Sequence, residues 1–580
     1  MQKDFIELTI NDIPVWVAPE TTLLDAARAI GVSIPTLCHD PQLTVTGACR
    51  LCVVEVENKD GTTRLEPSCS YPAQAGMVVR TNTREVRNAR RVIIELILAN
   101  HPHACQTCVR NGRCQLQSLC REYSIDEYKY EGARREVPKD TSTVAITRHP
   151  DYCINCGKCV KVCREVQEVN ALEFVNRGFS IVTMPALNLP LSETVCILCG
   201  QCLLKCPVAA IRDRSYVREV EAVLDEKKRL LTVQVAPAIR ASIGELFGLP
   251  PGSLLTRKIP TALRRLGFQH IFDTDFGADM AVMEEGHELL ERLNAGGPFP
   301  LITSCSPGWV KFMEHFYPEF IPNMSSTKSP QQIVGTLTKT FFAERRGVAP
   351  SEVYQVAIMP CSAKKWEIGL PQNSRNGLPD VDAVLTTREF ADLLRLHEID
   401  LPSLPDSDFD LLLGESSGAG VMFGAPGGMM EAALRTVCSI IEPGSDRLEF
   451  PVLRGYGGIK EGSLIVGDTE LKLCAVHGLG NARKVLDAIK SGEKTVHFLE
   501  VMACPGGCVG GGGQPLPTTE DIRKRRIEAI YAEDRSKPVR LSHRNPAVQE
   551  IYSSFLGQPL SEKAHELLHT GYSAREPHGI

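Results

Sequence analysis

Apolar and polar residues follow two different periods at the start of the chain, and each period predicts an element. Residues 5–17 alternate between the two kinds and predict a β-hairpin that turns at Asn11-Asp12. A helical pattern then begins at Thr21 or Thr22, a residue type that caps helices. The apolar face of this predicted helix consists of Leu23, Leu24, Ala27 and Ile30.

Strand-like sequence resumes over 51–56 and 77–81, and a helical pattern covers 84–99. The order strand, strand, helix, strand predicts a small β-grasp domain over residues 1–82. The polar segment 127–140 resembles a linker.

The pattern changes after Arg212. Short β-branched runs, LLTVQVAP, VAIMP and TVHFLEVMA, alternate with helical stretches, which predicts an α/β domain over 216–516. From Thr518 onward the sequence is helical, charged and free of cysteine. We expect this segment, 517–580, to wrap the preceding domain.

Composition excludes several classes of function. The 580 residues suggest roughly four domains, and 43% hydrophobic with 23% charged residues is ordinary for a soluble protein. A net charge of -6 without a basic domain argues against a nucleic-acid partner. The first residues lack a signal-peptide pattern, and apolar runs such as VIIELILA are too short to span a membrane. We therefore expect a cytoplasmic protein without a membrane partner.

Cysteine is the most informative residue. Of 22 cysteines, 16 lie before Pro207 in tight clusters. In a reducing cytoplasm, clustered cysteines indicate metal sites rather than disulfides, and a secreted disulfide scaffold is the alternative.

The first group is Cys38, Cys49, Cys52 and Cys69. Four thiolates from one loop and a later strand suit a 2Fe-2S cluster. Zinc is the alternative, although the long first gap is unlike the paired knuckles of a zinc ribbon.

The second group, His101, Cys105, Cys108 and Cys114, has the spacing H-x3-C-x2-C-x5-C and defines a domain over 83–138. One imidazole among three thiolates removes negative charge from a cluster, which raises its potential. By itself this ligand set fits zinc equally well. Cys120 falls outside the spacing, and we interpret it as a structural thiol.

The third signal is a repeat of C-x2-C-x2-C-x3-C at 153–163 and 196–206, within a two-cluster ferredoxin-type domain over 139–215. In such pairs the fourth cysteine of each run serves the other cluster. One 4Fe-4S cluster is therefore assigned to Cys153, Cys156, Cys159 and Cys206. The other is assigned to Cys163, Cys196, Cys199 and Cys202. Pro207 completes the usual ending of the second run, whereas Arg164 replaces the proline of the first.

Three motifs in the second half are TSCSPGW (303–309), MPCSAKKWE (359–367) and EVMACPGGCVGGGGQP (500–515). Together they resemble the signature motifs of FeFe hydrogenases. The likeness continues in QVAPAIRASIGE, FDTDFGADMAVMEE, SSTKSPQQ and HELLHTGY. It covers nearly the whole chain, and the first 210 or so residues also resemble the iron–sulfur subunit of complex I.

The resemblance implies an H-cluster, which is a 4Fe-4S cube bridged to a two-iron site carrying CO, CN⁻ and a dithiolate. Cys361, Cys504 and Cys508 match three cube ligands, and Cys508 matches the bridging one. Lys364 matches the partner of a cyanide, and Met359 and Met502 match apolar neighbours of the diatomic ligands. Further positions beside the cofactor are matched by Pro237, Gly507 and Gly511. Glycines there remove side chains where backbone approaches a bulky inorganic group.

The resemblance also implies a proton path, which consists of Cys305, Glu285, Ser325, Glu288 and Arg292. Glu285 and Glu288 share one face of a helix, as a relay requires. Without the resemblance we would interpret this pair as a solvated helix face.

One position departs from the family. Ser306 stands where the fourth cube ligand is normally cysteine, and a serine alkoxide is harder and more basic than a thiolate. Three outcomes are open: Ser306 ligates through oxygen, Cys305 ligates and leaves the proton path, or the site is weakened.

The implied function is reversible conversion of H2 into protons and electrons. The accessory clusters would pass electrons to an NAD(P)-linked flavoprotein with FMN and a small thioredoxin-like 2Fe-2S subunit, with ferredoxin as a further partner in electron bifurcation. The rival hypothesis is a non-catalytic electron-relay or redox-sensing subunit with a degraded H-cluster site. The glycine-rich turns 477–485 and 423–435 lack a dinucleotide fingerprint, and Cys438 and Cys474 are interpreted as core thiols.

Overall fold

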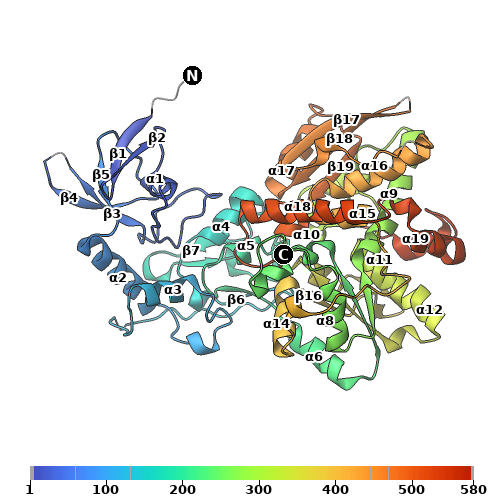
Figure 1. The fold of residues 1–580 in the computed structure, drawn as a ribbon, viewed down its shortest axis with the longest axis horizontal. Helices are drawn as coiled ribbons and strands as arrows, with labels where there is room; N and C mark the ends of the chain where they lie inside the picture. The colour runs from blue at the N-terminus through green and yellow to red at the C-terminus, as the bar shows by residue number, and fades with distance from the viewer. Residues whose placement is uncertain (1–4, 59, 131, 445, 468, 577–580) are drawn as a thin grey trace.

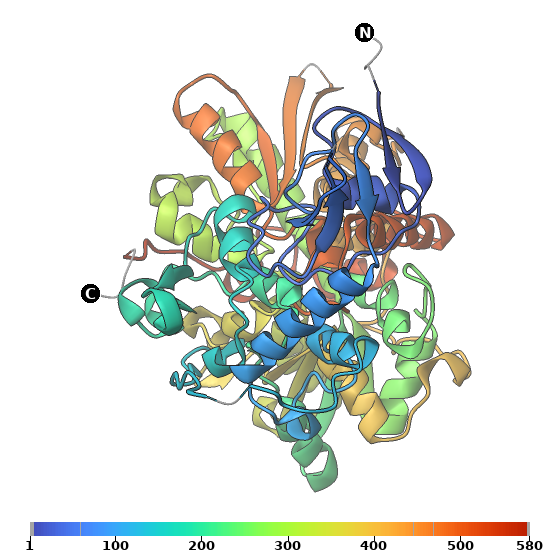
Figure 2. The same ribbon diagram turned by 90° about the vertical axis from the view of Figure 1, so that its left-hand side faces the viewer.

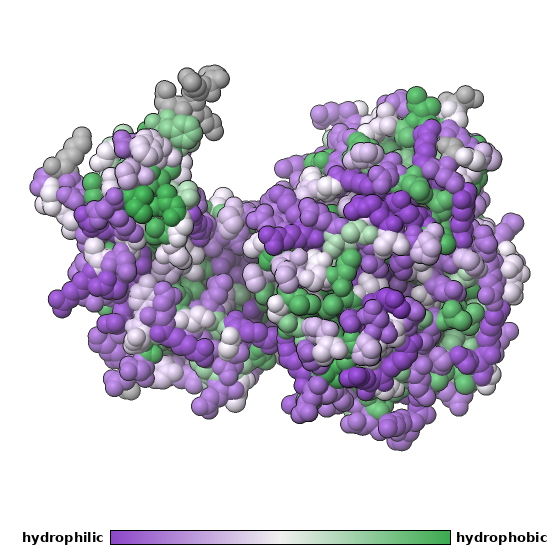
Figure 3. All heavy atoms as spheres, in the orientation of Figure 1, coloured by the Kyte–Doolittle hydropathy of each residue, from purple (hydrophilic) through white to green (hydrophobic). Residues whose placement is uncertain are grey.

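The chain folds into two bodies of unequal size (Figure 1). The structure is a computed structural model that describes residues 5–576 except 59, 131, 445 and 468. The smaller body holds the cysteine-rich first third of the chain, and the larger body holds the rest. In the space-filling view the upper surface is hollowed between them (Figure 3).

The smaller body begins with a five-stranded sheet in the order β2-β1-β5-β3-β4. Its strands are β1 (Ile6–Ile10), β2 (Ile13–Val17), β3 (Val53–Glu57), β4 (Thr63–Pro67) and β5 (Val78–Arg80). The predicted hairpin turns through Asn11 and Asp12, whose φ angles of 48° and 66° suit a two-residue hairpin turn. Thr22 caps helix α1 (Leu23–Ala29) by accepting a hydrogen bond from Asp25 N. The edge strand β4 was not predicted, because its residues are mostly polar and none of them is fully buried.

Helix α2 (Arg84–Ala99) has the predicted bounds and runs from the sheet toward the other cysteine-rich modules (Figure 2). Next come α3 (Gln115–Glu122), α4 (Lys158–Lys161) and α5 (Gln201–Lys205). Helices α4 and α5 belong to the two cysteine runs, and each follows a left-handed glycine, Gly157 or Gly200. Two short antiparallel pairs complete this region: β6 (Ile146–Arg148) pairs with β9 (Ile211–Asp213), and β7 (Glu173–Val175) pairs with β8 (Val182–Met184).

The larger body contains two four-stranded sheets. The first is wholly parallel, with strands β11 (His270–Asp273), β10 (Leu230–Val235), β13 (Val353–Met359) and β16 (Ala383–Thr386). The second is mixed, with strands β12 (Leu301–Ile302), β19 (Phe498–Met502), β18 (Thr469–His477) and β17 (Ile459–Val466). This arrangement agrees with the predicted α/β class.

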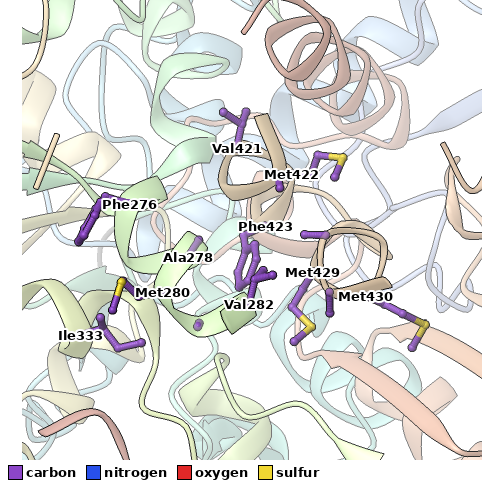
Figure 4. Close-up of a cluster of buried hydrophobic side chains, with 14 of the residues drawn as sticks. Phe276, Ala278, Met280, Val282, Ile333, Val421, Met422, Phe423, Met429 and Met430 are labelled. Carbon is purple, nitrogen blue, oxygen red and sulfur yellow. The ribbon is translucent and has the colours of Figure 1, made fainter. Parts of the chain in front are cut away.

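Helix α9 (Thr274–Ala295) lies in the main core, with α11 (Pro330–Leu337) and α16 (Gly428–Ile441) packed against it. Figure 4 shows the apolar side chains that meet there, including Phe276, Met280, Phe423 and Met429. Burying such side chains stabilises each by roughly 1.5–3 kcal/mol. The helix that carries Glu285 and Glu288 is therefore held rigidly.

Each motif directly follows the carboxyl end of a strand. Pro237 follows β10, Cys305 follows β12, Cys361 follows β13 and Cys504 follows β19. Open α/β sheets place their sites at this edge of the sheet. The fold thus gathers motifs that lie far apart in the sequence.

The last segment packs on the larger body as expected. It consists of α18 (Glu520–Ser536), α19 (Pro546–Ile551) and α20 (Glu562–Leu568). Arg526 of α18 donates to the Val509 carbonyl at 2.7 Å and pairs with Glu245 at 2.7 Å. Among the helices in the described ranges, none has the length and apolar character needed to cross a membrane.

Candidate functional site

The first cysteine group lies on a loop that docks against the ferredoxin-type module. Cys38 and Cys49 meet, with Cys49 N donating to Cys38 Sγ at 3.5 Å, and Cys52 lies beside Cys69. Lys205 of α5 forms an ion pair with Asp40 at 2.7 Å, two residues after Cys38. The loop that would hold the 2Fe-2S cluster therefore touches the helix that ends next to Cys206.

The tautomer and orientation of His101 leave its Nε2 atom available to bind a metal. Its Nδ1 lies 3.0 Å from the Pro102 carbonyl, which can only accept, so Nδ1 carries the proton. The Nε2 atom is buried and has no hydrogen-bond partner among the described residues. Burial lowers the pKa of His101, which favours the neutral ligand form. Cys105, Cys108 and Cys114 follow on the adjoining turn and helix start.

The fourth cysteine of each ferredoxin-type run lies with the first three cysteines of the other run. One internal cavity is lined by Cys153, Cys156, Cys159 and Cys206. A second is lined by Cys163, Cys196, Cys199 and Cys202. Among the described residues, no three His, Cys, Asp or Glu side chains lie close enough together to coordinate a single metal ion. The assignment therefore rests on the grouping of thiols around each cavity.

The second cavity adjoins the larger body at one point of close backbone contact. A Cβ on Gly512 would lie 2.4 Å from the Cys199 carbonyl oxygen and 2.7 Å from Gly200 Cα. Gln201 Nε2 donates to Gly510 O at 2.9 Å, and Cys504 Sγ lies 3.9 Å from Cys199 O. The accessory cysteines and the motif cysteines are thus direct neighbours.

Cys361, Cys504 and Cys508 converge at the edge of the two sheets. Burial and the adjacent Cys361 raise the pKa of the Cys508 thiol to about 12, and the same two causes raise the pKa of Cys504. Crowded thiols in a buried place suit cluster ligation, because bound iron removes their protons and compensates their charge. The donor set therefore fits a cube, with the fourth ligand left to Cys305 or Ser306.

Lys364 supplies a buried cation beside these thiols. Its Nζ lies 2.9 and 3.0 Å from the Glu367 carboxylate oxygens and 3.1 Å from the Cys305 carbonyl. Met359 and Met502 are buried at the same edge, 2% and 3% exposed. Lys364, Met359 and Met502 therefore lie in the region of the motif cysteines, and their roles beside the cofactor stay predictions.

The glycines of the third motif are required by protein contacts. A Cβ on Gly511 would lie 2.3 Å from Pro360 O, and one on Gly507, whose φ is +72°, would lie 2.5 Å from Met502 Sδ. Pro237 begins a helical turn after β10, at the same edge. The expected reason for these glycines was room for an inorganic group. The structure gives the close Pro360 backbone at Gly511, and the positive φ and close Met502 side chain at Gly507, as sufficient reasons.

The residues of the predicted proton path lie near one another. The Glu285 carboxyl lies within hydrogen-bonding reach of Ser325 and close to the Cys305 thiol. Arg292 donates to Glu288 at 2.8 Å and to Asn323 O at 3.0 Å. Burial raises the pKa of Glu285 well above its usual range, and Glu288 adds to this, so Glu285 favours the protonated form.

The structure distinguishes the environments of Cys305 and Ser306. Burial raises the pKa of Cys305, with Glu285 and Cys508 adding to the rise and Lys364 opposing it. Cys305 therefore lies near both Glu285 of the predicted proton path and Cys508 of the motif cysteines. Ser306 is the N-cap residue of α10 (Pro307–Phe316), yet its side chain makes no capping hydrogen bond. Its hydroxyl is not committed to the helix.

Two residues were missed from the sequence. Glu367 holds Lys364 and also accepts from Ser329 and Gln331 at 2.9 and 3.0 Å. Tyr572 donates to Ser325 O at 3.1 Å from the far end of the chain. Both lie in segments that carry the resemblance, but only the fold shows what their side chains contact.

His477 gives the third motif a pH dependence. Its Nδ1 accepts from Gly506 N at 3.1 Å while Nε2 faces Tyr456 O at 3.3 Å, so the ring is neutral. Burial lowers its pKa from 6.5 to about 4. As the pH falls, the unfolded chain therefore takes up a proton on His477 before the folded chain does. This lowers the free energy of unfolding by about 3 kcal/mol as pH falls from 6.5 to 4.

We expect the melting temperature to fall less steeply with decreasing pH in His477→Gln than in wild type, because the variant has no imidazole to protonate. Melting temperatures measured between pH 6.5 and 4 test this, and equal slopes for the two proteins would contradict it.

Family models match the chain in five places. Residues 229–512 match the iron only hydrogenase large subunit, C-terminal domain, and 520–575 match the iron hydrogenase small subunit. Residues 3–84 match a 2Fe-2S iron-sulfur cluster binding domain, and 189–212 match a 4Fe-4S binding domain. Residues 90–129 match the NADH-ubiquinone oxidoreductase-G iron-sulfur binding region.

The chain is 45% identical to the NADP-reducing hydrogenase subunit HndD of Solidesulfovibrio fructosivorans, over 98% of this chain and 99% of that relative. The chain belongs to the iron-only hydrogenase large-subunit family. It is also 38% identical to iron hydrogenase 1 of Clostridium pasteurianum, over 97% and 99% of the two chains.

Solved structures agree with this membership. A variant of the FeFe hydrogenase HydA1 of Chlamydomonas reinhardtii is 39% identical with a TM-score of 0.56, over 62% of this chain and 99% of that chain. In the present chain, the domains matched by iron–sulfur models lie in the smaller body, and the domain matched by the hydrogenase large-subunit model lies in the larger body. The chain is also 32% identical to the cytosolic Fe-S cluster assembly factor narfl of Danio rerio, over 62% of this chain and 90% of that relative.

Proposed function

We propose that this chain catalyses the reversible conversion of H2 into two protons and two electrons at an H-cluster held by Cys361, Cys504 and Cys508. The observation that carries the proposal is the position of Cys305. Its thiol lies between a buried proton path and the three converging cysteines, with the Lys364 cation alongside. A chain that only relays electrons has no need for a proton path that ends there.

When bound, the H-cluster supplies the two-electron chemistry, and the chain's own residues supply protons and charge. Arg292 holds Glu288 near the surface, Glu285 favours the protonated form, and Cys305 Sγ carries the proton nearest the site. The Lys364 ammonium places positive charge where anionic ligands would lie. Met359 and Met502 exclude water from the same edge, which strengthens these electrostatic effects.

Electrons would leave through four accessory clusters, one 2Fe-2S and three 4Fe-4S. The contacts of Cys504 with Cys199, and of Asp40 with Lys205, support a path from the H-cluster through the two ferredoxin-type clusters to the β-grasp domain. We assign domains at 1–82, 83–138, 139–215, 216–516 and 517–580. The name of the NADP-reducing relative supports a link to NADP and a place among other subunits. From the family resemblance we further propose a flavoprotein with FMN, a thioredoxin-like 2Fe-2S subunit and ferredoxin as partners, in the cytoplasm.

The function is tested by supplying the H-cluster to purified protein and measuring hydrogen evolution with reduced methyl viologen. Turnover that depends on both Glu285 and Cys508 would support the proposal. Fully loaded protein that evolves no hydrogen would contradict it and leave the relay hypothesis.

His101→Cys is expected to lower the potential of its cluster by roughly 100 mV or more, since a fourth thiolate adds negative charge. The other accessory clusters should keep their potentials. The measurement is a redox titration followed by EPR. His103→Cys is the matched control, because His103 contacts Arg134 and the Leu98 carbonyl instead of the cysteines. An unchanged potential in His101→Cys, or zinc at this site, would contradict the assignment.

A further inference from the structure

A cleft lined by both polar and apolar side chains reaches the proton path from a side that the proposed route does not use. It runs from Leu370 and Gln372 down to Ser304, the residue before Cys305. Gln332 Oε1 and Thr570 Oγ1, two of its lining atoms, are buried without a hydrogen-bond partner in the part of the chain that the structure describes. Buried polar atoms of this kind are the usual sites of ordered water. The cleft is therefore suited to hold water close to Ser304.

Tyr572 stands between this cleft and the proton path. Its ring lines the cleft and packs against the apolar cluster that contains Trp309 and Val310. Its hydroxyl donates to Ser325 O at 3.1 Å and lies within hydrogen-bonding reach of the Ser304 side chain. The Tyr572 hydroxyl thus connects Ser304, which precedes Cys305, with Ser325, which lies beside Glu285.

The phenol stays protonated in this position. Burial raises the pKa of Tyr572, and the carboxyls of Glu285 and Glu367 add to the rise. A neutral phenol donates its one proton to a carbonyl and so holds that proton rather than passing it on. The carbonyl of Ser325 cannot accept a proton and release it at the other side.

The chain holds Tyr572 from both directions. Before it, Lys328 N donates to Leu568 O at 2.7 Å and Thr570 N donates to Ser326 O at 2.7 Å. After it, Arg575 N donates to Glu314 O at 2.8 Å, and the Arg575 guanidinium lies 5.1 Å from the Trp366 ring. Anchors on both sides leave the ring little freedom to swing out of the cleft.

We propose that Tyr572 seals the proton path, so that water entering the cleft at Ser304 cannot deliver protons to Cys305 and the Glu288–Glu285 route alone does. The proposal rests on the proposed function. In it Tyr572 is a positioning residue: the ring blocks the cleft, and the hydroxyl fixes Ser304 and Ser325 at the correct separation. The last residues of the chain would thereby control proton access to a site built by residues far earlier.

The first test is the reaction of Cys305 with iodoacetamide in the fully loaded protein, followed by mass spectrometry. Tyr572→Ala opens the cleft and should raise the alkylation rate by about tenfold or more, because the thiol becomes reachable without local unfolding. Tyr572→Phe keeps the ring and should remain near the wild-type rate. His565→Ala, on the exposed face of α20, is the control for changes in the same tail. An unchanged rate in Tyr572→Ala, at wild-type iron content, would overturn the proposal.

The second test uses proton supply. Glu288→Gln should lower hydrogen evolution by about 10²-fold, the usual scale for a lost proton-transfer group. The double variant with Tyr572→Ala should evolve hydrogen about tenfold faster than Glu288→Gln alone, since water in the cleft then reaches Cys305. A double variant no faster than Glu288→Gln would overturn the seal. If Glu288→Gln alone costs no turnover, the proton path of the proposed function fails, and the alkylation rates still decide whether Tyr572 seals Cys305.

Discussion

Replacing Cys305 with alanine is expected to lower hydrogen turnover by about 10²- to 10⁴-fold while iron content stays at the wild-type value. The reason is the position of the thiol, which faces Glu285 and Lys364 and keeps its proton because burial raises its pKa. The measurements are hydrogen evolution with reduced methyl viologen and iron per chain on the same preparation. Cys438→Ala, in the apolar core, is the control for loss of a thiol.

The same pair of measurements determines what Ser306 does. Sulfur suits an iron–sulfur cube better than oxygen, so Ser306→Cys should bind at least as much iron as wild type and turn over at least as fast. If Cys305 has become the fourth ligand instead, Cys305→Ala loses cube iron together with activity. Restored iron in the double variant Cys305→Ala with Ser306→Cys would confirm that alternative.

Gly512→Ala is expected to separate the two bodies at the point where electrons would cross. Its Cβ would lie 2.4 Å from the Cys199 carbonyl oxygen and 2.7 Å from Gly200 Cα, and neither backbone atom can rotate away. Overpacking of this kind costs roughly 1–3 kcal/mol, and here it falls on the loop that also carries Cys504 and Cys508. We expect a lower melting temperature and iron content below wild type.

Gly132→Ala is the matched control, because an added Cβ there meets nothing within 4 Å. It should leave both the melting temperature and the iron content unchanged. Wild-type values for Gly512→Ala would show that the two loops can move apart freely, and would contradict the close contact between the accessory and motif cysteines.

The elements that the sequence predicted well are those with a strong local signal. Helix α2 has the expected bounds, since an apolar stripe and a Thr83 cap both mark it. The spacing also predicted that Cys206 groups with the first run and Cys163 with the second, as the linings of the two cavities have it. Their binding of clusters stays a prediction. Strand β4 was missed because an exposed edge strand has no buried face to produce alternation.

The parts of the site that were missed depend on tertiary contacts. Nothing local distinguishes Tyr572 from an ordinary tyrosine near a chain end, and its role arises from contacts with Ser304 and Ser325, which lie far earlier in the sequence. Glu367 lies within the second motif, but only the fold shows that its carboxylate holds Lys364. The glycines of the third motif were interpreted as room for a cofactor. The atoms that lie closest to Gly511 and Gly512 belong to Pro360 and Cys199, which are distant in sequence.

Family membership by itself does not separate an enzyme from a non-catalytic relative, since an iron–sulfur assembly factor aligns with much of the same chain. The infrared spectrum of protein loaded with the H-cluster makes that separation most directly. We predict absorption from metal-bound CO and CN⁻ in wild-type protein and its loss in Cys508→Ala, the variant without the bridging thiol. Loaded wild-type protein without those bands would contradict the assignment of an H-cluster to Cys361, Cys504 and Cys508.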